Sequence, residues 1–155
     1  MFYRKIEKED LSMWEKLAQS EFLEDDFCPK DYIIENWEFI NGWILMTDDS
    51  EWIGCFFNST QQFDFNSRGI HFLQICIFPK FRRKDNGKYL MKIAFDKSIG
   101  LQKSVCINPN NLPSIKLFEK YGFIETNVYE KWLVYICDKN YYPLSLNNIE
   151  IFEKA

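Results

Sequence analysis

The stretch ICIFPKFRRKDNGKYL, residues 75–90, decides the fold of this chain. It begins with an apolar run of the kind found in buried strands, and Pro79 ends that run. A basic turn follows and leads to Gly87, where a helix can start. Unpaired amides and the positive end of the dipole make a helix N-terminus an anion-binding site. The turn and the first helical residues add four cationic side chains: Arg82, Arg83, Lys84 and Lys88. The stretch therefore indicates either a pyrophosphate-binding turn or a solvated basic turn.

Apolar periodicity extends this strand–turn–helix unit in both directions. It predicts strands at about 2–6, 43–46, 51–57, 70–78, 104–107, 123–128 and 131–137, the second and third forming a hairpin. It predicts helices at about 11–18, 29–40, 85–99 and 111–121, with Asn41-Gly42 ending the second. The order β-α-α-β-β-β-α-β-α-β-β indicates an α/β (α+β) fold. We expect one domain over residues 1–155, with 138–155 as a C-terminal extension packed on it.

The composition is typical of a globular cytoplasmic protein. Of 155 residues 46% are hydrophobic and 27% charged, and no apolar run reaches the length of a membrane helix. The N-terminus lacks the apolar stretch of a signal peptide. A net charge of -4 disfavours nucleic-acid binding and is compatible with a cationic partner. Five widely spaced cysteines and a single histidine favour reduced core thiols and predict no metal site.

Two motifs in this order resemble those of the GCN5-related N-acetyltransferase (GNAT) superfamily. Residues 82–87, RRKDNG, are similar to the family's Gln/Arg-x-x-Gly-x-Gly/Ala, whose amides hold the CoA pyrophosphate, although Asp85 replaces the first Gly. Residues 111–123, NLPSIKLFEKYGF, resemble the family's Asn-x-x-Ala-x-x-Leu-Tyr-x-x-x-Gly-Phe, with Phe118 at the Tyr position. The resemblance covers roughly residues 43–137.

The resemblance implies the GNAT fold and an acyltransferase activity (EC 2.3.1.-). The expected sheet is mixed but mostly antiparallel, with six or seven strands, about four flanking helices, and a fourth and fifth strand that splay apart. The reaction implied is acetyl transfer from acetyl-CoA to a primary amine in a ternary complex, without a metal. The cofactor-binding residues implied are Ile75, Cys76, Ile77, Arg82, Arg83, Lys84, Asp85, Asn86, Gly87, Lys88, Asn111, Ser114 and Phe118.

Catalytic groups follow from the same resemblance. A backbone N–H within residues 75–77, with Ile77 as first choice, is expected to polarise the thioester carbonyl. His71 stands where the histone acetyltransferase branch has its catalytic glutamate, so it is the first candidate base. A purely structural role for His71, a base at Glu125 or Glu130, and a water-only route are the alternatives.

The general acid is the point where the chain departs from the family. Phe118 has no proton to give to the CoA sulfur. Tyr121, one helical turn further on, is either a substitute acid or a core residue. A thiolate is a good leaving group near neutral pH, so the reaction is also possible without an acid.

The acceptor is expected to be a small-molecule or peptide amine, bound by a monomer or a homodimer. Five acidic residues near the first two helices either line an anionic entrance or form a solvated acidic surface: Glu24, Asp25, Asp26, Asp31 and Glu35. The departures at Asp85 and Phe118 leave one competing function, a catalytically silent CoA-binding module that serves as a sensor or partner domain.

Overall fold

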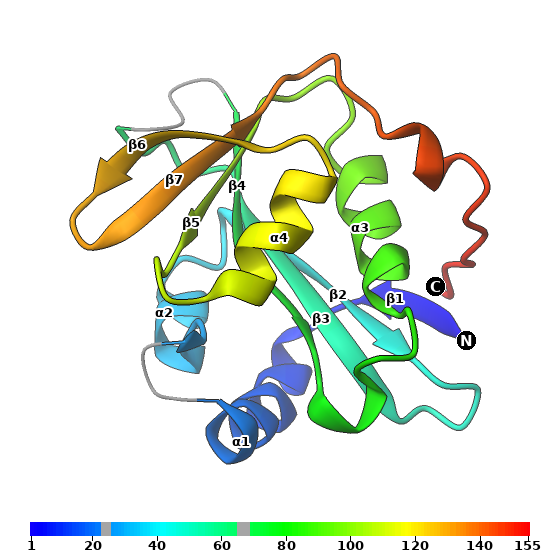
Figure 1. Ribbon diagram of the computed structural model, residues 1–155. Coiled ribbons are helices and arrows are strands. Elements are labelled where there is room, and N and C mark those ends of the chain that lie inside the picture. The colour runs from blue at the N-terminus through cyan, green and yellow to red at the C-terminus, as the bar shows by residue number, and fades with distance from the viewer. Residues whose placement is uncertain (23–25, 65–68) are drawn as a thin grey trace.

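The computed structural model describes residues 1–22, 26–64 and 69–155, and Figure 1 shows their arrangement. Its strands are β1 (Phe2–Lys5), β2 (Ile40–Met46), β3 (Trp52–Ser59), β4 (Ile70–Ile77), β5 (Lys103–Ile107), β6 (Ile124–Tyr129) and β7 (Trp132–Cys137). Its α-helices are α1 (Leu11–Glu21), α2 (Lys30–Glu35), α3 (Gly87–Asp96) and α4 (Leu112–Lys120). The order of these elements along the chain is the predicted one.

The seven strands form one sheet in the order β1-β2-β3-β4-β5-β7-β6. Neighbours are antiparallel except β4 and β5, which are parallel. The β4–β5 ladder pairs residues 70–72 with 103–105 and stops at Phe72↔Val105, although both strands continue. Beyond that pair the strands splay apart. The predicted fold class, including the splayed pair, is confirmed.

A bulge marks the point where β4 leaves β5. Phe57 of β3 pairs with Gln74, whereas the next residue, Asn58, pairs with Phe72, so Leu73 is the extra residue in β4. A bulge bends the strand that carries it and increases its twist. The bend therefore coincides with the last residue pair between β4 and β5.

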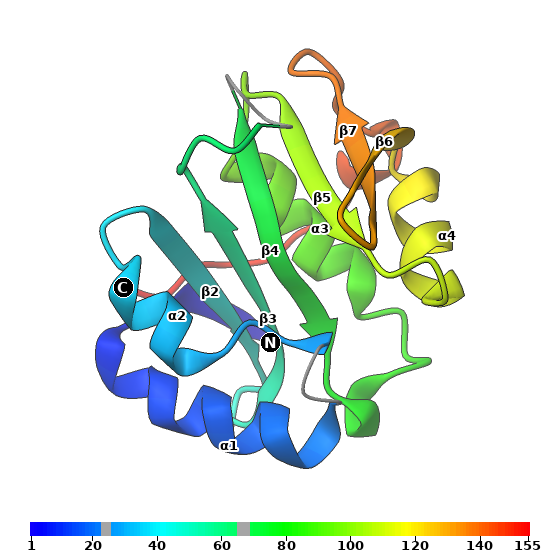
Figure 2. The ribbon, with the colours of Figure 1, turned by 90° about the vertical axis from the view of Figure 1, so that its left-hand side faces the viewer.

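Helices cover both faces of the sheet (Figure 2). On one face α1 and α2 bury an apolar cluster around Trp14 and Phe57, both fully buried. On the other face α3 and α4 bury a second cluster around Phe95 and Phe123. Burial of each such ring contributes about 2–3 kcal/mol to stability. These two cores hold the ends of β4 and β5 in place although the strands do not pair there.

The second helix is shorter than predicted. We expected it to run to Ile40 and to end at Asn41-Gly42, but α2 ends at Glu35 and Ile40 opens strand β2. Gly42 lies within that strand, where an added Cβ would come within 2.7 Å of Ile6 and Phe57. Glycine therefore permits a close approach of the strand to its neighbours and does not cap a helix.

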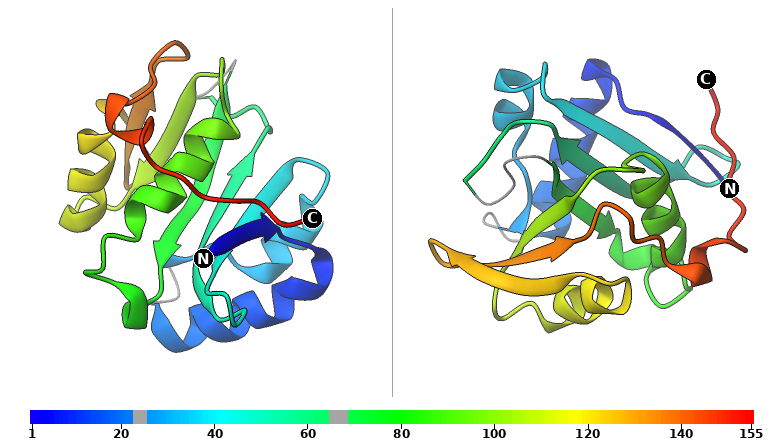
Figure 3. Two further views of the ribbon diagram at one scale, coloured as in Figure 1. Left: turned by 90° about the vertical axis from the view of Figure 1, so that its right-hand side faces the viewer. Right: turned by 90° about the horizontal axis from the view of Figure 1, so that it is seen from above.

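The C-terminal segment crosses α3 and reaches the free edge of β1 (Figure 3). The backbone of Tyr3 bonds to this segment in both directions, with Phe152 O at 3.0 Å and Lys154 N at 2.8 Å. Lys97, directly after α3, forms an ion pair with Glu153 at 2.9 Å. Leu146 of this segment is fully buried in the same core cluster as Phe95 and Phe123. Within the described ranges, no helix has the length and apolar character needed to span a membrane.

The approach of β3 to β4 at Gly54 gives a test of this packing. A Cβ at Gly54 would lie 2.3 Å from the backbone oxygen of Cys76 and 3.0 Å from Leu90 Cδ1. We expect Gly54→Ala to cost about 1–3 kcal/mol, because backbone has to move, and to lower the melting temperature by roughly 3–10 °C.

Gly87→Ala is the matched control, because the nearest atom to its added Cβ is Leu117 Cδ1 at 4.0 Å. Thermal unfolding of both variants beside the parent chain measures the difference. Equal melting temperatures for the two variants would contradict the register assigned to β3 and β4.

Candidate functional site

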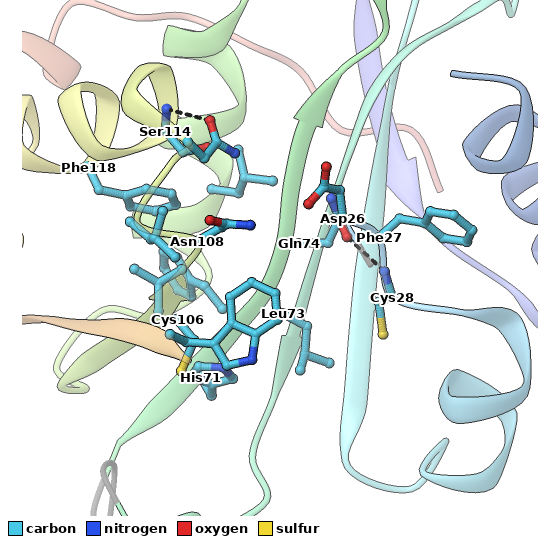
Figure 4. A pocket seen from close by; sticks show the side chains of 16 residues that line it. Asp26, Phe27, Cys28, His71, Leu73, Gln74, Cys106, Asn108, Ser114 and Phe118 are labelled. Carbon is cyan, nitrogen blue, oxygen red and sulfur yellow. Dashed lines mark hydrogen bonds between the residues drawn. The ribbon is translucent and has the colours of Figure 1, made fainter. Parts of the chain in front are cut away.

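A cleft of about 240 Å³ opens where β4 and β5 separate. In Figure 4 its side chains come from three directions: β4 through the middle, β5 and α4 on one side, and the segment before α2 on the other. The lining residues are Asp26, Phe27, Cys28, His71, Phe72, Leu73, Gln74, Ile75, Val105, Cys106, Ile107, Asn108, Asn111, Ser114, Phe118 and Trp132.

The unpaired stretch of β4 presents main-chain donors to this cleft. Phe78 N donates to Ile53 O at 2.9 Å, so the amide of residue 78 points toward β3. Amides alternate in direction along a strand, so those of Ile75 and Ile77 point to the opposite side, where β5 has moved away. Two main-chain donors of the predicted 75–77 stretch thus face the gap, and Ile77 is one of them. Cys76, between them, points its amide toward β3 instead.

The turn before α3 has the backbone that anion binding requires. Arg83 and Asp85 adopt left-handed conformations, with φ of 61° and 59°. Asp is one of the few non-glycine residues that adopt this region readily. Asp85 therefore keeps the backbone of the glycine that it replaces in the motif. None of the described residues accepts a hydrogen bond from the amides of Arg83, Lys84 or Asp85.

Side chains of this turn hold one another and leave net positive charge. Asp85 forms an ion pair with Lys88 at 2.8 Å, and this hydrogen bond lowers the pKa of the Asp85 carboxyl. Arg82 Nε donates to Ile77 O at 2.9 Å, which ties the turn to the end of β4. Asn86 Nδ2 donates to Phe81 O at 2.9 Å. Lys84, like Arg83, makes no ion pair within the described part of the chain.

The opposite wall comes from β5 and α4. Asn111 caps α4 by accepting a hydrogen bond from Ser114 N at 3.3 Å, and both residues line the cleft. Phe118 is buried and also lines it, with no hydroxyl to offer. Cys106 lies on the same wall, and burial raises the pKa of its thiol to about 11, so it is protonated near neutral pH.

Tyr121 lies apart from the cleft. Its ring is 3% exposed and belongs to the core beneath α3 and α4. Burial raises the pKa of its hydroxyl. The charges that act on this hydroxyl belong to Asp85, in the turn before α3, and to Lys88, in the first turn of α3. Tyr121 therefore feels the charges of that turn and does not line the cleft between β4 and β5.

His71 lines the inner end of the cleft. Its Nδ1 lies 2.9 Å from Ser104 Oγ, across the β4–β5 ladder, and its ring packs edge-on against Phe63. The side chain is 6% exposed. Burial lowers the pKa of His71 to about 4, so the imidazole is neutral at pH 7 but a weak base. The exposed Glu125 and Glu130, the alternatives for the base, do not line the cleft.

The third wall of the cleft is the segment before α2, and only Asp26 among its residues was predicted from the sequence. Asp26, Phe27 and Cys28 line the cleft from the segment before α2. The backbone of Cys28 is held from two sides: its N–H donates to Gln74 Oε1 and its carbonyl accepts from Trp14 Nε1, both at 2.9 Å. This anchoring fixes the exposed Asp26 over the gap. Of the other predicted acidic residues, Asp31 and Glu35 do not line the cleft, and Glu24 and Asp25 lie outside the described residues.

The structure thus brings together part of the predicted set. His71, Ile75, Asn111, Ser114 and Phe118 line the cleft, and the 82–88 turn follows directly on β4. Gln74 and Trp132 line it without having been predicted, because neither belongs to a motif. The wall around Cys28 is held by hydrogen bonds to Gln74 and Trp14, which are distant from it in the sequence. No local sequence signal therefore marked this wall. Among the described residues, no group of three or more His, Cys, Asp or Glu side chains is arranged to hold a metal.

Comparisons with known proteins agree with this geometry. The sequence profile described as "Acetyltransferase (GNAT) family" matches residues 10–123. A search among curated protein sequences gives no match. Two solved structures similar to this chain are spermidine N-acetyltransferases from Vibrio cholerae. One, in complex with CoA and spermine, has 19% identity and a TM-score of 0.63, covering 86% of this chain and 91% of its own. The other, a dodecamer in an intermediate state, has 17% identity and a TM-score of 0.65, covering 86% and 90%.

The buried His71 predicts an acid-sensitive stability. Between pH 6.5 and 4 the unfolded chain binds a proton that folded His71 does not, so stability falls as the pH is lowered through this range. We expect this residue to account for a loss of about 2 kcal/mol between pH 7 and pH 4.5.

Urea unfolding of the parent chain and of His71→Gln at both pH values measures this contribution. His71 is the only histidine, so the comparison cancels the carboxylates common to both chains. An equal acid-induced loss in the variant would show that His71 is not held neutral by burial.

Proposed function

Because the chain belongs to the acetyltransferase (GNAT) family, we propose that it acetylates a small cationic amine of the polyamine class by direct attack within a ternary complex. The family matches most of the chain, and its reaction is acetyl-CoA-dependent N-acetylation of an amine, with acetyl-CoA as the cosubstrate. The acceptor class and the residue roles are the parts that this proposal adds.

The observation that carries the proposal is the gap between β4 and β5 beside an open helix N-terminus. The CoA pyrophosphate would bind the amides of the 83–87 turn, where Lys84 and its neighbours add positive charge. The pantetheine arm would then run into the cleft along the unpaired edge of β4. There the N–H groups of Ile75 and Ile77 are the candidate donors to the thioester oxygen, which gains negative charge in the transition state.

Proton transfer in this proposal needs no strong base. Because burial leaves His71 a weak base, with a pKa of about 4, we propose that the ammonium group loses its proton to the bulk solvent, through water in the open cleft, before the neutral amine attacks. His71 then serves as a neutral hydrogen-bonding side chain at the inner end of the cleft. Neither Phe118 nor the buried Tyr121 supplies an acid at the sulfur, so CoA departs as the thiolate.

The acceptor would enter past the segment before α2. Asp26 is the acidic side chain among the cleft's lining residues, and an ammonium group would pair with it there. Trp132 on the opposite side offers an aromatic face for the methylene groups or for a cation–π contact. The two solved structures named above are spermidine N-acetyltransferases, one of them with spermine bound, which supports this acceptor class.

We further propose that the protein acts in the cytoplasm as a homodimer. All five cysteines are free thiols, as in proteins of reducing compartments. Strand β6 lies at the edge of the sheet and is exposed along its whole length, including Ile124 at 69% and Val128 at 59%. An exposed apolar edge strand is a surface for pairing with another chain.

Binding of CoA gives the direct test of the cosubstrate site. We expect CoA at a hundredfold excess over its Kd to stabilise the parent chain by about 2.7 kcal/mol, a rise of roughly 5–10 °C in melting temperature. Gly87→Trp should abolish this rise, because the indole would cover the turn amides, and the atom nearest to the added Cβ is Leu117 Cδ1 at 4.0 Å. Met13→Trp, on the exposed side of α1, is the matched control and should keep the rise.

Turnover separates the enzyme from the silent CoA-binding module. Thiol release from acetyl-CoA is measured with spermidine, spermine and N-terminal peptides as acceptors. CoA-induced stabilisation without thiol release on any of them would favour the module and exclude the proposed enzyme.

The acceptor assignment is tested at Asp26. Asp26→Asn should lower kcat/KM for spermidine about threefold to tenfold through KM, because one charge-assisted contact is lost, and should leave KM for acetyl-CoA unchanged. Asp31→Asn makes the same charge change at an exposed position outside the cleft, and we expect less than a twofold effect. If both variants behave alike, Asp26 does not bind the acceptor.

A further inference from the structure

A second cavity lies at the opposite end of β5 from the cleft. Its volume is about 250 Å³, and it sits where the turn after α3 meets the chain that leaves β7 (Figure 1). Six of its lining residues matter here: Phe95, Ile99, Lys103, Lys139, Tyr141 and Tyr142. Lys103 begins β5, whereas the β5 residues that line the cleft are Val105, Cys106 and Ile107, and no described residue lines both cavities. The two sites are therefore separate.

Lys103 is a buried cation with incomplete hydrogen bonding. Its side chain is 1% exposed, and its Nζ donates one hydrogen bond, to Leu101 O at 2.7 Å. An ammonium group has three donors. No carboxylate in the described part of the chain forms an ion pair with it. Burial lowers the pKa of Lys103, and the nearby Cys137 and Asp138 only partly oppose this effect. A buried ammonium in this state favours an anion as its neighbour.

The remaining walls include aromatic and aliphatic side chains. Nζ of Lys103 lies 5.2 Å from the centroid of the Phe95 ring, and Tyr142 packs edge-on against that ring at 5.9 Å. The Tyr142 hydroxyl is already engaged, donating to Asp96 at 2.6 Å and accepting from Lys92 at 2.8 Å. Tyr142 therefore presents its ring and not a free hydroxyl. Ile99 closes the outer side of the cavity with an aliphatic surface that is 70% exposed.

We propose that this cavity binds a small organic carboxylate, with its carboxylate on Lys103 and its apolar part against Phe95, Ile99 and Tyr142. The carboxylate supplies acceptors for the two remaining N–H groups of the ammonium. Lys139 at the same cavity adds a second positive charge. The volume suits one ring with a carboxylate, since a dry cavity of about 150 Å³ holds benzene. Inorganic phosphate would satisfy the charge but would leave the aromatic and aliphatic walls without a partner.

Benzoate is the probe for this site, with inorganic phosphate as the second arm. Calorimetric titration of the full chain should give a benzoate Kd of about 0.1–1 mM, a normal affinity for a ligand of this size. Lys103→Met should weaken benzoate about thirtyfold or more, the effect of deleting one partner of a buried charge pair. Thermal unfolding checks that the variant remains folded.

Ile99→Trp tests the cavity without touching the ammonium. The indole should block the mouth and weaken benzoate at least about tenfold, as expected for a filled pocket. Met13→Trp introduces the same side chain on the other face of the sheet and should change the Kd less than twofold. Chemical-shift changes in the parent chain should be centred on residues 95–103 and 139–142.

Three results would overturn the inference. The first is no benzoate binding by the parent chain up to 10 mM, on the order of ten times the weakest Kd expected for so small a ligand. The second is an unchanged benzoate Kd in both Lys103→Met and Ile99→Trp. The third is phosphate binding at least as tightly as benzoate. The site is independent of acetyl transfer, so each of these results leaves the proposed activity untouched.

Discussion

The structure depends on the separation of two parallel strands that are held apart from both faces. β4 and β5 pair over three residues and then diverge, which leaves main-chain donors at Ile75 and Ile77 without partners on the sheet. Unpaired amides inside a protein are unfavourable unless something accepts their hydrogen bonds. The bulge at Leu73 and the two apolar cores keep the strands from closing. The same constraint that weakens the sheet therefore creates the surface that a thioester arm can occupy.

The turn before α3 illustrates how a motif can change its residues and keep its geometry. The family motif has a glycine where this chain has Asp85, yet the backbone there remains left-handed. The carboxylate is directed to Lys88, so it neutralises a neighbouring cation and does not face an incoming phosphate alone. Backbone conformation and not side-chain identity is the property that the site requires. Replacement of the motif's glycine by Asp85 therefore leaves the backbone conformation of the turn unchanged.

Sequence reasoning succeeded where the signal was local. The strand that Pro79 ends and the helices expected from about residues 85 and 111 were all readable from neighbouring residues, and α3 and α4 begin within two residues of those positions. It failed at 36–42, because an apolar spacing suited to a helix was overridden by a strand that packs its glycine against Phe57. The wall formed around Cys28 was also unreadable. Its position depends on Gln74 and Trp14, which are distant along the chain and belong to no motif.

The two edges of the sheet are unequal, and this has a consequence for self-assembly. At β1 the terminal segment occupies the backbone of Tyr3, whereas β6 presents its outer backbone to solvent. A sheet that can extend at both margins adds copies without limit, as fibrils do. If copies pair through β6, as proposed, the occupied margin at β1 would stop growth after a single two-fold pairing. In that assembly, the segment around Phe152–Lys154 would prevent open polymerisation by covering the backbone of Tyr3.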